Sequence, residues 1–209
     1  MGIDVKSIIV DAMLQLCEEK HLKKITIGDI QAKSGISRQT FYNHFKDKDD
    51  LIQYCYDSVI VPDWYAGDNS SDGKLDDDYI ADMFLWRTEY LKSIIKYGRF
   101  MKMACAMDGP NCLWEHIFSE TREFELKWHE TLFRRKLTKE MIEATEYHTF
   151  ATTYMIVDWI KNDMPVSAEE LTNKIMRNKV MSLGEILGGN KYSSPYVRMR
   201  EFIMQKEGA

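Results

Sequence analysis

Proline and glycine are scarce in this sequence. Its 209 residues include 4 prolines and 11 glycines. Because both residue types interrupt helices, their scarcity favours a chain built mainly of helices. We therefore expect an all-α fold.

Cysteine is also sparse, and no pair of cysteines has the spacing of a metal or redox motif. Cys17, Cys55, Cys105 and Cys112 include no CxxC pair, which predicts free, largely buried thiols in a reducing compartment. The N-terminus lacks the pattern of a signal peptide. No uncharged apolar run approaches the ~18 residues that a membrane helix requires. We expect a cytoplasmic protein that does not contact a membrane.

The patterns that mark enzymes are missing too. None of the histidines belongs to an HExxH sequence, a catalytic triad context or a zinc-binding spacing, and no glycine-rich phosphate loop is present. Two pairs, Glu18 with His21 and Glu125 with His129, have the spacing to share a helix face. We interpret both pairs as surface charge. The sequence thus predicts no catalytic residues, no cofactor and no metal.

An overall positive charge is lacking, since the net charge is -5. A protein of this charge does not hold nucleic acid by bulk attraction, so any DNA contact must come from a local patch. One such patch exists. From Lys33 to Lys48 there are four lysines or arginines and one acid, Asp47.

What the sequence has in abundance is apolar residues at helical spacing. Residues 62–75, rich in Gly, Asn, Ser and Asp, are the clearest loop and a predicted joint. The tail, Tyr192 to Ala209, could form one more short helix or be loosely held. The predicted helices cover 3–20, a segment opening at Thr26, 38–45, a segment from Asp47 to near Pro62, 76–97, 99–107, 111–136, 138–162 and 167–187.

The segment from Thr26 to Leu51 has the pattern of a helix-turn-helix. Thr26 and Asp29 have capping-box-like spacing at the start of one helix. Gly35 stands where the chain must turn sharply. Phe41 and Phe45, four residues apart, can fix the next helix to its neighbours.

The second helix of such a unit fits the DNA major groove, with its first side chains at base edges. Arg38 could bond guanine, Gln39 could pair with adenine, and Tyr42 could bond phosphate. On spacing alone, these residues could equally be the solvated face of a three-helix packing. The predicted DNA-contacting residues are Thr26, Ser37, Arg38, Gln39, Thr40, Tyr42, Asn43, His44, Lys46 and Lys48.

The string SGISRQTFYNHFKDKDDL closely resembles the signature of the TetR family of transcriptional regulators, and the resemblance covers residues 5–55. It implies a DNA-binding head of three helices, a fourth helix that joins the head to the body, and a homodimer. By resemblance, Thr26 and Tyr42 contact phosphate, and Lys48 anchors on the DNA backbone. The positions that match the recognition helix are Arg38, Gln39, Thr40 and His44.

The segment DWIKNDMPVSAEELTNKI, from Asp158 to Ile175, is similar to the C-terminal domain of a TetR subgroup that includes DhaS-type regulators of dihydroxyacetone kinase operons. That resemblance implies a regulator whose effector could be a partner protein and not a small ligand. Both kinds of effector remain open on the sequence.

Methionines and aromatic residues crowd the middle of the body, and such a set can line an apolar ligand pocket. The same spacing is also that of an ordinary core. The candidate pocket residues are Trp86, Tyr90, Tyr97, Met101, Met107, Trp114, Phe118, Trp128 and Tyr154. Residues 138–187 could form a four-helix interface between two subunits, or one chain could bury these faces internally.

These observations predict three segments: a helix-turn-helix domain over 1–47, a helical effector-binding and dimerisation domain over 48–190, and a C-terminal tail over 191–209. The predicted function is a sequence-specific regulator, most simply a repressor. It would bind double-stranded DNA at a palindromic operator and be released by an effector in the body.

Overall fold

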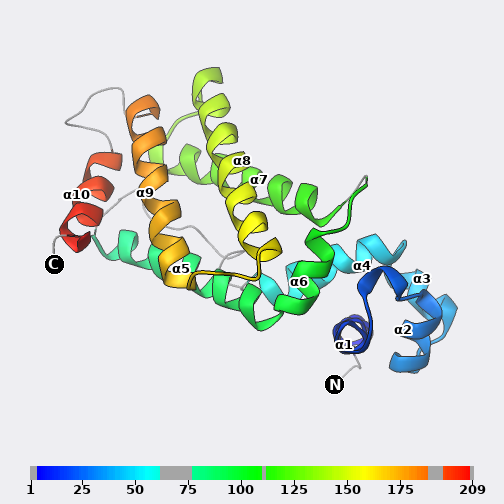
Figure 1. Cartoon of the computed structure of the whole chain (residues 1–209). Coiled ribbons are helices and arrows are strands. Elements are labelled where there is room, and N and C mark those ends of the chain that lie inside the picture. Colours follow the sequence, from blue (N-terminus) through cyan, green and yellow to red (C-terminus); the bar gives the residue numbers. More distant parts are fainter. Residues whose placement is uncertain (1–3, 62–76, 110–111, 188–194, 208–209) are drawn as a thin grey trace.

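The computed structural model describes residues 4–61, 77–109, 112–187 and 195–207. Within these ranges all regular structure is helical, which confirms the all-α prediction. The head lies at one end of the molecule and the C-terminal helix at the other (Figure 1). The predicted joint over 62–75 lies outside the described residues.

The head is a compact group of short helices. Its bounds are α1 (Val5–Glu19), η1 (Leu22–Lys24), α2 (Ile27–Ser34) and α3 (Arg38–His44). The next helix, α4 (Lys48–Cys55), leads from the head to the body and continues into the π-helical turn η2 (Tyr56–Ile60). The predicted capping box at Thr26 and Asp29 is present. Gly35 ends α2 with φ 73°, a left-handed conformation that glycine adopts without strain. Local capping and one turn residue therefore set the angle between α2 and α3.

The body consists of longer helices that lie beside one another (Figure 1). Their bounds are α5 (Asp77–Lys96), α6 (Gly98–Cys105), α7 (Leu113–Phe133), α8 (Lys139–Lys161), α9 (Ala168–Leu187) and α10 (Pro195–Glu207). Each body helix predicted from apolar spacing is present within a few residues of its predicted bounds. The tail does form a helix, α10, whose Met199 and Ile203 are buried against the body.

Two apolar clusters hold the chain together. One runs from the head into the body, and it joins Met13, Phe41 and Leu51 to Phe100 and Ile160. The other fills the far end of the body between α5, α7, α8, α9 and α10. The first cluster therefore packs side chains of the head directly against side chains of the body.

Helix α6 supplies two polar contacts between body and head. Arg99 Nε donates to the carbonyl of Cys17 in α1 at 2.6 Å. The backbone N–H of Leu22 in η1 lies 3.3 Å from the sulfur of Met103. Both bonds cross from the head to α6, so this short helix fixes the position of α1 relative to the body.

The cysteines are unpaired thiols, and Cys17, Cys55 and Cys105 are buried. Burial raises the pKa of the Cys17 and Cys105 thiols to about 12, because an apolar environment disfavours the thiolate. Among the helices described, none combines the length and the apolar character needed to cross a membrane.

Candidate nucleic-acid interface

Helix α3 turns one face inward and the opposite face to solvent. Phe41 is fully buried and Phe45 is 2% exposed, whereas Tyr42 is 43% exposed. The Phe41 and Phe45 ring centroids are 5.8 Å apart, and Phe45 packs edge-on against Tyr54 of α4 at 5.3 Å. The two phenylalanines therefore fix the rotation of α3 about its axis. The side chains that this rotation leaves exposed are Arg38, Gln39, Tyr42, Asn43 and His44.

The start of α3 is closed by Ser37. Its hydroxyl accepts the backbone N–H of Thr40 at 3.0 Å, and the two side-chain hydroxyls lie 2.8 Å apart. A serine cap of this kind satisfies an N–H group that the helix leaves without a partner. Ser37 thus has a structural task, and Thr40 is half-buried beside it.

The exposed side chains of α3 are paired with one another at helical spacing. Gln39 Nε2 donates to Asn43 Oδ1 at 3.0 Å. The Arg38 guanidinium lies 5.7 Å from the centre of the Tyr42 ring. Each of these contacts is exposed and is therefore weak enough to be exchanged for a base or a phosphate.

Thr26 stands at the start of α2. Its hydroxyl accepts the N–H of Asp29 at 3.2 Å and lies 2.7 Å from Asp29 Oδ2. The ion pair of Asp29 with Lys20, at 2.6 Å, and these capping bonds hold the pKa of the Asp29 carboxyl well below its usual range. The predicted phosphate contact at Thr26 would therefore use a hydroxyl whose position the cap already fixes.

Lys48 is the predicted contact whose position differs most from expectation. Its ammonium group is half-buried and donates to the carbonyl oxygens of Leu22 at 3.2 Å and Ile25 at 3.1 Å. It therefore ties the start of α4 to the turn between α1 and α2. Lys46 is exposed, and only its backbone N–H bonds, to Asp50 Oδ2 at 2.8 Å.

In the body, the structure does not bring the nine candidate pocket residues together. Trp86 and Trp128 line one small cavity, and Tyr154 lines a separate groove between α8 and α9. Trp114 and Phe118 stack on each other with centroids 5.8 Å apart. The remaining four, Tyr90, Tyr97, Met101 and Met107, belong to or pack against the apolar cluster that reaches into the head.

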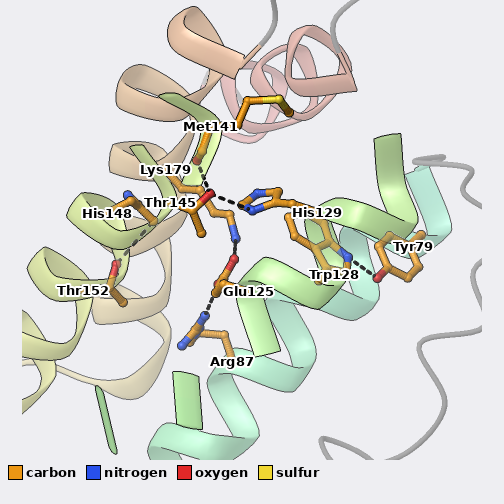
Figure 2. Close-up of polar contacts among 10 residues, drawn as sticks. All are labelled: Tyr79, Arg87, Glu125, Trp128, His129, Met141, Thr145, His148, Thr152 and Lys179. Carbon is orange, nitrogen blue, oxygen red and sulfur yellow. Dashed lines mark hydrogen bonds and ion pairs between the residues drawn. The ribbon is translucent and has the colours of Figure 1, made fainter. Parts of the chain in front are cut away.

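The prediction that Glu125 and His129 form a surface pair is wrong. Both are buried, at 4% and 0% exposure. Glu125 Oε2 accepts from Lys179 Nζ at 2.6 Å, and Arg87 lies 3.7 Å from Glu125 Oε1 (Figure 2). The reason is that α9 supplies a buried cation opposite α7, and the sequence does not reveal that pairing.

Two buried histidines lie beside this ion pair (Figure 2). The Thr145 hydroxyl is 3.2 Å from His129 Nδ1, and the Thr152 hydroxyl is 3.3 Å from His148 Nε2. Burial lowers the pKa of His129 to about 3 and that of His148 to about 4. Burial alone would raise the pKa of Glu125, but the nearby Lys179 ammonium and Arg87 guanidinium outweigh it and hold that pKa at about 2.

The sequence does contain a signal for this polar core. Thr145, His148 and Thr152 recur at helical spacing on the buried side of α8. A stripe of polar residues where a helix should be apolar indicates a buried network. Within the described part of the chain, no group of three or more potential ligand side chains could hold a metal ion.

Comparisons with known proteins agree with this architecture. Residues 9–55 match the family described as bacterial regulatory proteins, tetR family. Residues 82–178 match the family described as transcriptional regulator C-terminal region.

One curated relative is the HTH-type dhaKLM operon transcriptional activator DhaS of Lactococcus lactis subsp. lactis (strain IL1403). It is 23% identical over 151 residues, which are 70% of this chain and 67% of the relative.

A solved structure of DhaS shows the same fold. The dihydroxyacetone kinase operon activator DhaS superposes with a TM-score of 0.62 at 17% identity, covering 89% of this chain and 98% of that chain. A complex of RolR with resorcinol gives a TM-score of 0.47 at 15% identity, covering 95% of this chain and 92% of that chain. With a helix-turn-helix head and a body that each match a regulator family, the chain belongs to the TetR family of DNA-binding transcription regulators, with a DhaS-like C-terminal region.

Proposed function

We propose that the chain binds an approximately palindromic operator as a homodimer and represses transcription until an effector engages the body. The observation that carries the DNA-reading part is the outward face of α3, whose orientation is fixed by the buried Phe41 and Phe45. A recognition helix must present the same side chains to every DNA site that it reads. The burial of Phe41 and Phe45 keeps the rotation of α3 fixed, so the same side chains always face outward.

The exposed side chains divide by chemistry. Arg38 offers a guanidinium fork suited to guanine, and Gln39 an amide suited to adenine. Tyr42, Thr26 and Lys46 have donors suited to phosphate, which position the protein without reading sequence. The same face is bordered by Asn43, His44, Ser37 and Thr40. In this proposal Lys48, at the start of α4, approaches the DNA backbone.

The proposed dimer uses residues 138–187. In α8 the side chains of Tyr147, Phe150 and Tyr154 are 73%, 49% and 58% exposed. Their spacing of three and four residues places them on one side of the helix. An exposed aromatic stripe of this kind is typical of a surface that a protein partner covers.

Release by an effector requires that the body shift the two heads relative to each other. The bonds from Arg99 to the carbonyl of Cys17 and from Leu22 to Met103 place α6 on this route. An effector that favours one packing of the body would change the spacing of the heads, so they would no longer match successive grooves. We accordingly keep the division into a reading head (1–47), an effector-binding and dimerisation body (48–190) and a tail (191–209).

A second candidate function is regulation by a partner protein. Two observations favour it. The groove beside Tyr154, between α8 and α9, has a volume of about 430 Å³, whereas the cavity at Trp86 and Trp128 has about 40 Å³. The curated relative is named as an activator. In this version the body would bind a coregulator and the regulator would activate transcription.

One pair of measurements tests these proposals. We expect the purified chain to bind a duplex with two inverted half-sites and to lose most affinity when one half-site is reversed. The same operator placed in a reporter promoter should lower transcription when the chain is present. Higher transcription that requires a second protein would overturn repression and support the partner-protein version.

A further inference from the structure

A small cavity lies in the body between α5, α7 and α9, outside the DNA-reading surface. Its volume of about 40 Å³ counts the space open to the centres of water-sized groups. One water needs roughly 10–15 Å³ by that measure. The cavity therefore accepts a very small molecule. Its lining residues are Tyr79, Met83, Trp86, Arg87, Phe124, Glu125, Trp128, Met176 and Lys179.

The charged groups of this cavity do not balance. Arg87 and Lys179 are basic, and Glu125 is the single carboxylate among the described lining residues. Burial lowers the pKa of Lys179, but its 2.6 Å bond to the Glu125 carboxylate favours the charged ammonium. The nearby histidines stay neutral at ordinary pH because burial lowers the pKa of His129 to about 3 and of His148 to about 4. Among the described lining residues, one net positive charge therefore remains in a largely buried environment. An uncompensated buried cation is unfavourable, and an anion in the cavity would remove that penalty.

Arg87 is the cation that Glu125 satisfies least. Glu125 Oε2 bonds Lys179 at 2.6 Å, but Arg87 approaches Glu125 Oε1 only to 3.7 Å. That distance is too long for a hydrogen bond. Although its side chain is only 11% exposed, the Arg87 guanidinium makes no hydrogen bond to the part of the chain that the structure describes. Figure 2 shows the three groups in a row, with Glu125 between Arg87 and Lys179.

The rest of the lining is apolar and flat. Trp86 and Trp128 lie on opposite helices, and Met83 and Met176 complete the wall. The Lys179 ammonium lies 4.4 Å from the centre of the Trp128 ring, which holds it at the cavity. A ligand that fits must therefore pair an anionic end with a short apolar end.

We propose that this cavity binds a short-chain carboxylate of about two to four carbons. The planar guanidinium of Arg87 takes the carboxylate through two parallel hydrogen bonds. Lys179 contributes a second charge, and the alkyl end lies against Met83 and the two tryptophans. The effector of the regulator is then a short-chain carboxylate, an inference that rests on the proposed function.

The test uses the full-length chain without DNA. Sodium propionate is compared with propionamide, which has the same shape without the charge, and with sodium chloride at equal ionic strength. Thermal unfolding and tryptophan fluorescence report binding, since Trp86 and Trp128 line the cavity. We expect propionate to raise the unfolding temperature and to change the fluorescence in a saturable way, and the other two to do neither. Equal effects of propionate and propionamide, or of propionate and chloride, would overturn the proposal.

Three variants locate the site. Arg87→Met keeps the bulk and removes the fork, and should weaken propionate binding roughly tenfold or more. Met83→Trp should fill the cavity and abolish binding while the charges remain. Lys92→Met is the matched control, because Lys92 lies on the same helix in exposed ion pairs with Glu89 and Glu169. Unchanged propionate affinity in Arg87→Met would place any binding elsewhere. If Arg87→Met does not fold, Met83→Trp and the comparison with propionamide still show whether propionate binds in this cavity.

Propionate binding and its effect on operator affinity are measured independently. Operator affinity of the ligand-free chain tests the DNA-reading function alone. If propionate binds as described but leaves operator affinity unchanged, the carboxylate site stands and its role as the effector site is overturned. If operator binding itself is absent while propionate binds, the proposed function fails and the site does not.

Discussion

Arg38 and Gln39 stand side by side on the exposed face of α3, where a base-reading role makes a distinct prediction. Arg38→Ala should relax base preference at one position of each half-site, because a lost bidentate contact removes about 1–3 kcal/mol of discrimination. Competition binding with single-base operator variants measures this. Tyr42→Phe is the control, since it should weaken all duplexes alike. A uniform loss in Arg38→Ala would contradict base reading.

Lys48 makes a prediction about stability. Its ammonium donates to two carbonyl oxygens in the turn before α2. Lys48→Ala should therefore lower the free energy of unfolding by about 1–3 kcal/mol, as measured by urea denaturation. If Lys48 also reaches a phosphate, the salt slope of DNA binding falls by about 0.9. Lys46→Ala should change the slope without changing stability, and a Lys48→Ala variant of unaltered stability would show that these bonds contribute nothing.

The buried histidines predict acid lability. Burial lowers the pKa of His129 to about 3 and of His148 to about 4, whereas the unfolded chain titrates near about 6.5. The unfolded state binds protons at these histidines that the folded state does not bind. Their contribution to the free energy of unfolding is therefore fully present above about pH 6.5 and is lost as pH falls. Each histidine should remove about 2 kcal/mol of stability between pH 7 and pH 5.

Unfolding free energies of wild type and His148→Gln at the two pH values check this expectation, and the variant should depend less steeply on pH. His116 acts in the opposite sense. Although its burial opposes protonation, the Asp57 carboxylate at 2.8 Å raises the pKa of His116, so its contribution is lost as pH rises. If the stability of His148→Gln depended on pH as steeply as that of the wild type, His148 would not contribute to the acid lability.

At the residue scale, the sequence predicted the roles that local chemistry fixes. The cap at Thr26, the turn at Gly35 and the burial of Phe41 all depend on residues a few positions apart. It did not predict the Lys48 contacts, because those carbonyls lie in η1 and at the residue that ends it, in a turn whose hydrogen bonds leave no side-chain pattern.

Among the helices, α10 is the one whose contribution the sequence left open. Met199 is fully buried against α5 and α9, and Ile203 is 7% exposed. Met199→Ala should therefore lower the free energy of unfolding by about 2–5 kcal/mol. Met204→Ala is the control, since Met204 is 63% exposed and its loss should change stability by no more than about 0.5 kcal/mol. Equal effects in chemical denaturation would mean that α10 does not pack on the body as described.

Apolar spacing predicted the helices well because each amphipathic helix buries one continuous stripe. The π-helical turn η2 shows the limit of this reasoning. It continues α4 through Tyr56–Ile60, and its side chains keep a helix-like order in sequence. Its altered hydrogen bonds accompany tertiary contacts, such as the 2.8 Å bond between the Tyr56 and Tyr90 hydroxyls, which no local pattern encodes.

On the scale of the whole molecule, the proposed dimer depends on the aromatic stripe of α8. Tyr154→Glu should place charges against each other at the two-fold interface and shift the chain to a monomer. Sedimentation velocity measures the mass. Leu85→Glu is the control, because Leu85 is a comparably exposed apolar residue on α5, at 55% against 58% for Tyr154. A dimer that persists in Tyr154→Glu would exclude this surface as the main interface.

The interior of the body was the least predictable part of the molecule. Trp86, Trp114 and Tyr154 are all aromatic residues on body helices, and the sequence does not distinguish them. In the structure Trp86 lines the small cavity, Trp114 stacks on Phe118 and Tyr154 lines the groove between α8 and α9. Which aromatic residues meet is decided by how α5, α7, α8 and α9 pack. The ion pair of Lys179 with Glu125 likewise joins positions 54 residues apart, a distance over which local sequence carries no information.

The central claim is that two copies of α3 read an inverted repeat. Selection of bound duplexes from random DNA by the purified full-length chain tests it most directly. We predict enrichment of two inverted half-sites whose centres lie about 10–10.5 base pairs, or a multiple of that spacing, apart, and loss of the preference at one position per half-site in Arg38→Ala. Recovery of no shared motif, or of a motif unchanged by Arg38→Ala, would contradict the account.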